Sequence, residues 1–212
     1  MTPPTVNADY SAAENNINFP AGILQPPFYS NEADDAVNYG AVGVVIGHEL
    51  THGFDDEGRQ FDADGNLKDW WQKSDADEFE KLSNCFVKEY GSFSPLPDVT
   101  LNGKLTLGEN TADDGGLHLA YLALMDDLSK KGTPASTKQD GYTQPQQFFL
   151  GFAQIWCMHV TPEWERLTAQ VDPHSPGKFR TNGVVSNAPQ FSEAFGCKTG
   201  DKMYAAKGCR VW

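Results

Sequence analysis

The sequence contains two histidines and a glutamate at a spacing that can hold a metal ion. His48, Glu49 and His52 lie in the run HELTH, in which the histidines are four residues apart. Side chains at this spacing on a helix have Cβ atoms about 5–6 Å apart, so two imidazoles can bind one zinc ion. Glu49 can then take a proton from a zinc-bound water as that water attacks a carbonyl. The motif therefore predicts metal-assisted hydrolysis.

The alternative is a helix that carries two surface histidines and a solvated glutamate. Apolar residues flank the motif on both sides in GVVIGHELTHGF, which indicates a helix in the core or beside a cleft. Unpaired imidazoles are costly in such a place. The surrounding sequence favours the metal site.

A hydrolytic zinc needs a third protein ligand, and Glu109 in LGENTADDGG is the best candidate. Asp113 follows one helical turn later and can hydrogen-bond a ligand histidine. Alternatively, Thr106 and Glu109 form a capping box at a helix start, and Asp113 is a solvated surface acid. The pair Gly115–Gly116 indicates tight packing of this helix against another element, which favours the ligand role.

His174 lies among prolines, a serine and a glycine in DPHSPG, a rigid loop that does not suit a core histidine. An imidazole in such a loop can stabilise negative charge that develops in a transition state. The alternative is an exposed loop histidine without a role. Taken alone, Arg180 is typical of a surface salt bridge.

The apolar periodicity predicts a mostly helical chain. The first 35 residues are expected to be extended or loop, because the proline-rich segment Phe19–Phe28 excludes a helix. Ser74 is the expected N-cap of the second helix. Six helices are expected, at about residues 35–52, 74–90, 106–130, 143–156, 161–171 and 189–195.

The composition is that of an ordinary folded protein, with 212 residues, 39% hydrophobic and 21% charged. A formal net charge of -13 disfavours a nucleic-acid partner. No apolar run is long enough to cross a membrane, and residues 1–10 do not resemble a signal peptide. No linker divides the chain, so we expect one domain over 1–212.

Four cysteines, Cys85, Cys157, Cys197 and Cys209, show no metal-binding spacing. They permit three disulfide connectivities, and counting alone does not choose among these or free thiols.

Several motifs occur in the order found in one enzyme family. The chain resembles the neprilysin and endothelin-converting enzyme family of zinc endopeptidases, and the likeness runs from about Val6 to Trp212. The motifs that carry it are HELTHGFDD, LGENTADDGG, VNADY, FPAGILQPPF, VDPHSPGKFR and the final CRVW. The resemblance implies a predominantly helical α+β zincin fold of the thermolysin type. In that fold, the helix with His48 and His52 packs against the helix with Glu109 and Asp113.

The resemblance also implies the chemistry of the centre. One zinc ion is expected on His48, His52 and Glu109, with Glu49 as the general base. Asp113 is expected to orient a ligand histidine, and is also described as a proton donor. Asp55 would support a ligand histidine, and His174, oriented by Asp172, would stabilise the oxyanion.

The same resemblance implies how substrate is held. Arg180 would bind a substrate carbonyl, and Asn7 and Ala8 would hydrogen-bond the substrate backbone. The expected apolar S1′ pocket is lined by Phe28, Val44, Val45, Ile155 and Trp156.

The implied activity is zinc-dependent cleavage of peptides on the amino side of hydrophobic residues. The family's compartment is extracytoplasmic or secreted, although this chain shows no targeting segment of its own. Two alternatives remain: a truncated catalytic part that binds zinc and peptides without cleaving them, and a zinc hydrolase of non-peptide amides.

The chain departs from the family pattern in three ways. Family members are several times longer, with an upstream helical lid region that this chain lacks. In the family Cys85 pairs with Cys209, whereas the partners of Cys157 and Cys197 lie upstream, so these two are free, paired together, or cut off from their partners. Asp9 stands where the family usually carries a bulky residue.

Overall fold

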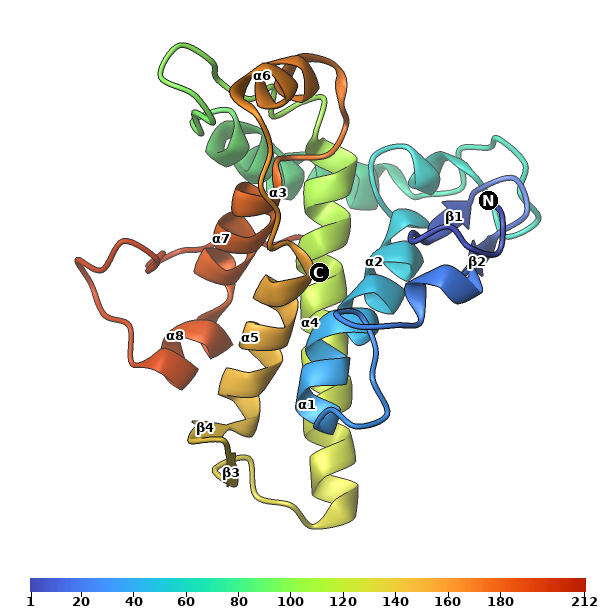
Figure 1. Cartoon of the computed structure of the whole chain (residues 1–212). Coiled ribbons are helices and arrows are strands. Elements are labelled where there is room, and N and C mark those ends of the chain that lie inside the picture. Colours follow the sequence, from blue (N-terminus) through green and yellow to red (C-terminus); the bar gives the residue numbers. More distant parts are fainter.

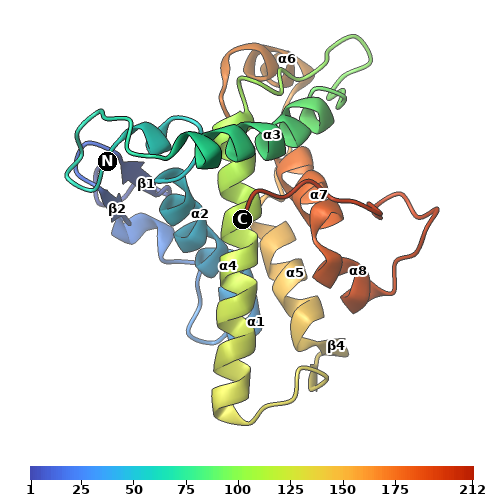
Figure 2. The ribbon, with the colours of Figure 1, turned by 180° about the vertical axis from the view of Figure 1, so that it is seen from behind.

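The computed structural model describes residues 1–212 and is built around one long helix, α4, Leu107–Lys131 (Figure 1). Helix α2, Val44–His52, packs along one side of α4, and α5, Gln144–Ile155, lies on its other side. Seen from behind, α3, Lys73–Tyr90, crosses the upper part of α4 (Figure 2). The predominantly helical architecture expected from the sequence is confirmed.

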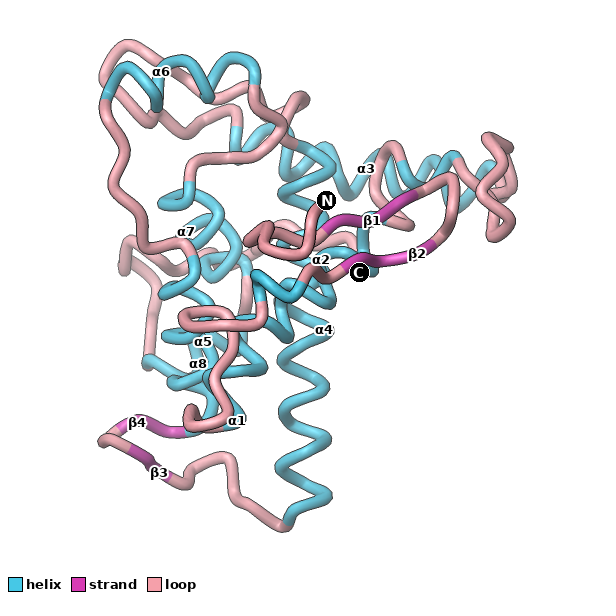
Figure 3. Tube along the Cα trace, turned by 45° about the vertical axis from the view of Figure 1, so that its right-hand side comes forward, coloured by secondary structure: helices cyan, strands magenta, loops and turns pink.

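The remaining elements are short. The other helices are α1 Asp35–Asn38, α6 Pro162–Val171, α7 Gly177–Asn187 and α8 Pro189–Phe195. Two antiparallel hairpins supply all the strands (Figure 3): β1 Asp9–Ser11 with β2 Asn16–Asn18, and β3 Lys138–Gln139 with β4 Tyr142–Thr143. The register of the first hairpin pairs Asp9 with Asn18.

Two apolar clusters hold these helices together. The larger one fills the space between α2, α4, α5 and α7, and its fully buried members include Leu124, Phe148, Phe152 and Val184. The smaller one joins α3 to α7 and the C-terminal segment around Phe86 and Tyr90. The larger cluster contacts α4 and α7, and the smaller one contacts α7. Together they hold in place the two helices that carry Glu109, Asp113 and Arg180.

The expected helix over 35–52 is continuous but not uniform. Residues Tyr39–Gly43 form a π-helical turn between α1 and α2. Such turns occur where one extra residue is accommodated in a helix, often near functional sites. The turn lies directly before the segment that bears the two histidines.

Other expectations about helix ends need correction. Helix α3 begins at Lys73, and its N-cap is Gln72 rather than Ser74. Thr106 is the N-cap of α4, but its hydroxyl donates to the carbonyl of Asn102 and does not cap the helix. The capping-box explanation of Glu109 is therefore wrong. Helix α5 does have the capping box, formed by Thr143 with Gln146.

Two elements were not expected. Helix α7 follows the DPHSPG loop directly, and its glycines and short polar residues conceal it from periodicity because they favour helices weakly. The β3–β4 hairpin lies in a segment expected to be a polar loop.

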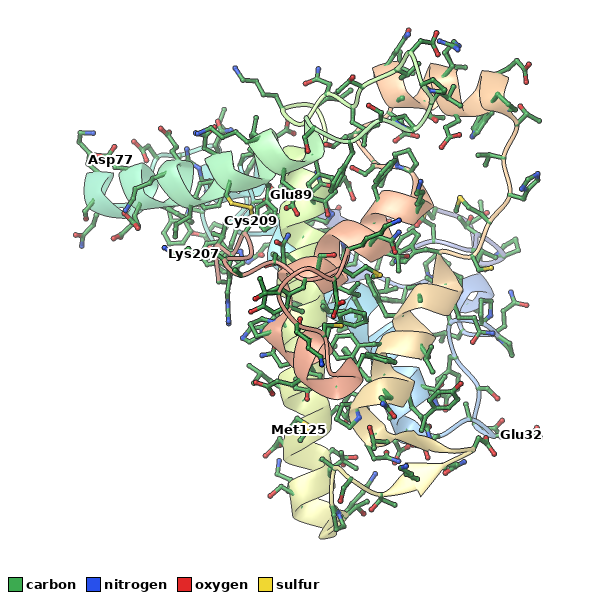
Figure 4. All side chains as sticks on the ribbon, turned by 90° about the vertical axis from the view of Figure 1, so that its left-hand side faces the viewer. Glu32, Asp77, Glu89, Met125, Lys207 and Cys209 are labelled. Atoms are coloured by element: carbon green, nitrogen blue, oxygen red, sulfur yellow. A yellow bond between two sulfur atoms is a disulfide. The ribbon has the colours of Figure 1, made fainter.

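One disulfide joins Cys85 on α3 to Cys209 near the C-terminus (Figure 4), as the resemblance implies. Cys157 and Cys197 are free, and Cys157 is exposed. None of the helices combines the length and apolar character needed to cross a membrane.

Candidate metal centre and active site

Helix α2 presents the two histidines and the glutamate of the HELTH motif to a cleft. His48 and His52 lie one turn apart, and their Nε2 atoms are 3.0 Å from each other. Glu49 is 5% exposed and lines the same cleft. The two imidazoles therefore converge on one point, as the spacing predicts, and the explanation by two independent surface histidines is wrong.

Glu109, in the first turn of α4, lies on the opposite side of that point. Its Oε2 is 3.3 Å from His48 Nε2, and its Oε1 is 3.7 Å from His52 Nε2. Ligand atoms at about 2.0–2.1 Å from a tetrahedral zinc are roughly 3.4 Å apart. These residues therefore fit a zinc ion in the spacing and the chemistry of their donors. The donor atoms of His48, Glu49 and His52 also lie within 4.8 Å of one another, so Glu49 is next to the centre as well.

The approach of the two helices brings the three side chains together. A Cβ built on Gly47 would lie 2.8 Å from the carbonyl oxygen of Gly116, and one on Gly116 would lie 2.5 Å from the amide nitrogen of His48. Any side chain at either position would push α2 and α4 apart. Glycine at these positions therefore permits the helix spacing that the metal centre requires.

Each of the two histidines has a carboxylate on its Nδ1 side. His52 Nδ1 lies 2.6 Å from Asp55 Oδ2, and the other oxygen of Asp55 accepts from the amides of Glu57 and Gly58. His48 Nδ1 is 2.8 Å from Asp113 Oδ1, although the two atoms are not aligned as in a hydrogen bond. Carboxylates in this position orient an imidazole and direct its Nε2 toward a metal.

Asp113 is shared between the centre and Arg180 of α7. Arg180 donates from Nε to Asp113 Oδ2 at 2.7 Å and from Nη2 to Oδ1 at 2.6 Å, a bidentate pair. Both side chains are buried, and the guanidinium lies 3.9 Å from the ring centre of Trp156. The hydrogen bonds of Arg180 within the protein come from Nε and Nη2 and leave Nη1 without a partner. The surface salt-bridge explanation of Arg180 is wrong.

The charges of the centre act on one another. Burial lowers the pKa of His48, but Asp113 and Glu109 outweigh this and raise it to about 9. Burial raises the pKa of Glu109, but His48 and Arg180 outweigh this and lower it to about 2. The centre without a metal therefore holds a positive charge on His48, and a divalent cation can supply that charge instead.

His174 lies at the mouth of the cleft, 47% exposed at its side chain. Its Nδ1 is 2.7 Å from Asp172 Oδ1, and the same oxygen accepts from the His174 amide. The ring's Nε2 is 3.3 Å from Glu109 Oε1 and so points toward the centre. Asp172 thus fixes the ring with its Nε2 directed at Glu109.

A cavity of about 710 Å³ surrounds these groups. Of the candidate site residues, all except Asp172 line it, and Asp172 stands behind His174. The apolar candidates Phe28, Val44, Val45, Ile155 and Trp156 line it where it meets the larger apolar cluster, which contains Val44 and Ile155 and packs against the other three, so they form an apolar wall.

Sequence reasoning did not assign several other lining residues to the site. They come from β1 and from the loops after α2 and α5, and they include Asp9, Tyr10, Glu57, Phe61 and Met158. Glu57 and Phe61 follow the HELTH motif closely in the sequence, and this proximity could have predicted that they line the cleft. Nothing in the local sequence indicates that the loop after α5 reaches the cleft.

Comparison with known proteins agrees with this geometry. The model of peptidase family M13 matches residues 7–211. Human endothelin-converting enzyme 1 is 49% identical over 100% of this chain and 27% of its own length, and human neprilysin is 48% identical over 98% and 28%. A zinc metalloprotease of Mycobacterium tuberculosis, solved with an inhibitor, superposes with a TM-score of 0.95 at 44% identity, over 100% of this chain and 33% of that one.

The chain therefore spans about a third or less of the length of these relatives, and the match covers nearly all of its own residues. Sequence, fold and the arrangement of the HELTH motif lead to the same assignment: the chain belongs to peptidase family M13.

Proposed function

We propose that this chain is the catalytic domain of a zinc-dependent endopeptidase that cleaves peptides on the amino side of hydrophobic residues. The observation that carries the proposal is the convergence of two imidazoles and one carboxylate beside buried Glu49, at the floor of a cleft. Family membership supports the reaction class. The apolar wall of the cleft supports the preference for a hydrophobic side chain.

His48, His52 and Glu109 would hold one zinc ion. When bound, zinc supplies a Lewis acid that lowers the pKa of a coordinated water toward about 7 and polarises a carbonyl. Asp113 and Asp55 keep the two imidazoles oriented with Nε2 toward the ion.

Glu49 is placed to act as the general base. Burial raises its pKa above the value of a free glutamate, which makes it a better proton acceptor near neutral pH. The carboxylate takes the proton of the attacking water and passes it to the leaving amine. His174, held by Asp172, donates a hydrogen bond to the oxyanion that forms from the substrate's carbonyl oxygen. Asp113 orients His48 and Arg180 and does not need to transfer a proton in this scheme.

Substrate would lie along the edge of the β1 segment. Asn7 and Ala8 precede β1 and line the cavity, so their backbone groups can pair with an extended peptide. Arg180 Nη1 can donate to a substrate carbonyl. The residue after the scissile bond enters the apolar wall formed by Phe28, Val44, Val45, Ile155 and Trp156.

We infer that the protein works in an extracytoplasmic compartment and together with an upstream lid region. The disulfide Cys85–Cys209 supports an oxidising compartment. The greater length of the relatives supports a further region that controls access to the cleft.

Peptide hydrolysis tests the function directly. The zinc-loaded chain should cleave an internally quenched peptide before Phe or Leu, and a chelator should abolish cleavage. Glu49→Gln should keep stoichiometric zinc but lose at least about a hundredfold in kcat, because the proton acceptor is gone. His52→Ala and Glu109→Val should lose the metal itself, measured by elemental analysis after dialysis. Full activity of Glu49→Gln would refute the mechanism, and zinc and peptide binding without hydrolysis would identify a binding module instead.

A further inference from the structure

Two carboxylates in the cleft are not used by the proposed mechanism. Asp9 on β1 and Glu57 in the loop after α2 both line the cavity. Neither forms an ion pair within the protein, whereas Glu109 and Asp113 both pair with Arg180 and a histidine. Asp9 and Glu57 are therefore negative charges that face the substrate without a cation of their own.

The first hairpin holds Asp9 in place. Asp9 pairs with Asn18 across the two strands, and Asn18 Nδ2 donates to Asp9 Oδ2 at 3.0 Å. The other oxygen, Oδ1, accepts no hydrogen bond from the protein. Asp9 is half-buried and lines the same cavity as Glu49. The carboxylate is therefore held by Asn18 through one oxygen, and its other oxygen has no hydrogen-bond partner within the protein.

Asp9 and Glu57 lie toward the end of the cleft away from the apolar wall. Val44 and Val45 of that wall are at the start of α2, whereas Glu57 follows the end of this helix. The β1 strand runs toward the same end, where the Tyr10 hydroxyl packs against Gly53. A helix of this length separates the two ends by about 13 Å. The cleft thus has its apolar wall on one side of the metal centre, and on the other side it carries two carboxylates without a cation partner, beside Tyr10 and Phe61.

The overall charge of the cleft strengthens this asymmetry. The carboxylates that line it are Asp9, Glu49, Asp55, Glu57, Glu109 and Asp113. Arg180 is the only arginine or lysine among the lining residues, and it is already paired with Asp113. Even with a divalent cation bound, acidic groups outnumber the positive charges. An acidic substrate side chain would be repelled on this side, and a basic one attracted.

We propose that Asp9, assisted by Glu57, forms a subsite that binds a lysine or arginine side chain of the substrate on the amino-terminal side of the scissile bond. This inference rests on the proposed function, because that function sets the direction of the peptide along the cleft. The preferred substrates are then peptides in which a basic residue shortly precedes the bond and a hydrophobic residue follows it.

A panel of quenched peptides tests the subsite. Each carries Phe after the scissile bond and lysine, norleucine or glutamate at one of the three preceding positions. Norleucine has nearly the length of lysine without its charge. At one of these positions kcat/KM should be about three- to tenfold higher for lysine than for norleucine, and lower again for glutamate. The lysine preference should shrink as the ionic strength rises.

Variants assign the preference to the named residues. Asp9→Asn should reduce the lysine-to-norleucine ratio toward one, and Asp9→Lys should reverse it in favour of glutamate. Asp140→Asn is the matched control, since it makes the same change in the exposed β3–β4 turn, at the far end of the molecule from β1 (Figure 3). It should leave the ratio unchanged. Glu57→Gln should lower the ratio less than Asp9→Asn.

Binding is measured alongside cleavage. The same peptides, fluorescently labelled and N-methylated at the scissile bond, are titrated with the zinc-loaded chain and followed by anisotropy. Tighter binding of the lysine peptide that is lost in Asp9→Asn supports the subsite even if no peptide is cleaved, an outcome that would refute only the proposed function. Equal binding and cleavage of the lysine, norleucine and glutamate peptides would overturn the inference, as would a lysine preference that survives in Asp9→Asn.

Discussion

Asp113 contacts both His48 of the candidate metal centre and Arg180, which lines the cleft. One of its oxygens is within 2.8 Å of His48 and 2.6 Å of Arg180, and the other is 2.7 Å from Arg180. Opposite charges on both sides hold the pKa of Asp113 well below its usual range, against the effect of burial. A single buried carboxylate therefore contacts His48 and Arg180 at the same time.

Arg180→Met tests whether this buried pair is structural as well as functional. The variant keeps an apolar stem of similar length but leaves Asp113 without its bidentate partner, so we expect a loss of about 3 kcal/mol of unfolding free energy. Urea unfolding with chelator present measures it without the metal's contribution. The double variant Arg180→Met/Asp113→Asn should recover part of the loss, because no unpaired charge is then buried. An unchanged stability in Arg180→Met would mean that this arginine serves the substrate alone.

At the scale of single residues, the sequence predicts most where positions are close along the chain. His48, Glu49 and His52 follow from one helical spacing. Glu109 required an argument about helix packing, and its capping-box alternative was refuted only by the hydroxyl of Thr106 bonding elsewhere. The environment of Asp9 could not be predicted from the sequence, because it depends on the course of the loops around the cleft.

Among the elements, the contact between α2 and α4 determines the metal site. The backbones approach so closely at Gly47 and Gly116 that neither position has room for a Cβ. The two glycines weaken their own helices by about 1 kcal/mol each relative to alanine. Glycine at both positions lets the two helices approach closely enough for His48 and His52 of α2 to meet Glu109 of α4.

Gly47→Ala should therefore disturb the geometry of the metal centre, although Gly47 is not itself one of its ligands. Its Cβ would meet the Gly116 carbonyl at 2.8 Å, forcing a shift of the helix backbones that we expect to cost about 1–3 kcal/mol. The shift should also weaken zinc binding, measured by competition with a chromophoric chelator. Gly43→Ala is the control, because the nearest atom would be 3.5 Å away. Equal behaviour of the two variants would contradict the role given to the helix contact.

Helices with clear apolar periodicity were predictable, and those shaped by tertiary packing were not. The segments that became α5, α6 and α8 begin and end close to where the sequence predicts. Helix α7 was missed because Phe179, Val184 and Val185 are buried by neighbouring elements, whereas its own residues favour helices weakly. The π-helical turn before α2 leaves no mark in the apolar pattern.

For the molecule as a whole, the C-terminal segment is linked to α3 and to the residues just after α2. The disulfide closes a loop with a sequence separation of 124 residues. Beyond it, the ring of Trp212 lies 6.2 Å from that of Phe54, just after the HELTH motif, and 5.8 Å from Phe79 on α3. The C-terminal residue thus packs against both α3 and the segment that follows α2.

Removing the Cys85–Cys209 disulfide should destabilise the whole domain. Cys85→Ser/Cys209→Ser is expected to lose about 3–5 kcal/mol of unfolding free energy, because the unfolded chain regains the freedom of a long loop. Urea unfolding under non-reducing conditions measures the loss. Cys157→Ser/Cys197→Ser, which replaces the two free thiols, should be nearly neutral. Comparable losses in the two double variants would contradict this account.

The stability of the molecule should also depend on pH through Asp114. This carboxyl lies on α4 beside Asp113, and its surroundings include Glu89 and Arg210. Burial raises its pKa from 3.8 to about 7, despite the opposing effect of Arg210. A raised folded-state pKa means that the folded protein binds this proton more tightly than the unfolded chain does. The resulting stability is present below about pH 4 and is lost as the pH rises toward 7.

Asp114→Asn should remove that dependence, because asparagine stays neutral at every pH. Part of Asp114 remains exposed to water, so we expect the variant to be only about 1–2 kcal/mol more stable than the parent at pH 8. The difference should become small near pH 4, where the parent's carboxyl is protonated in the folded state and about half protonated in the unfolded chain. Urea unfolding at a series of pH values from 4 to 8 measures the two curves. Parallel curves would show that Asp114 titrates in the folded protein as it does in the unfolded chain, and that its charge is already solvated in the fold.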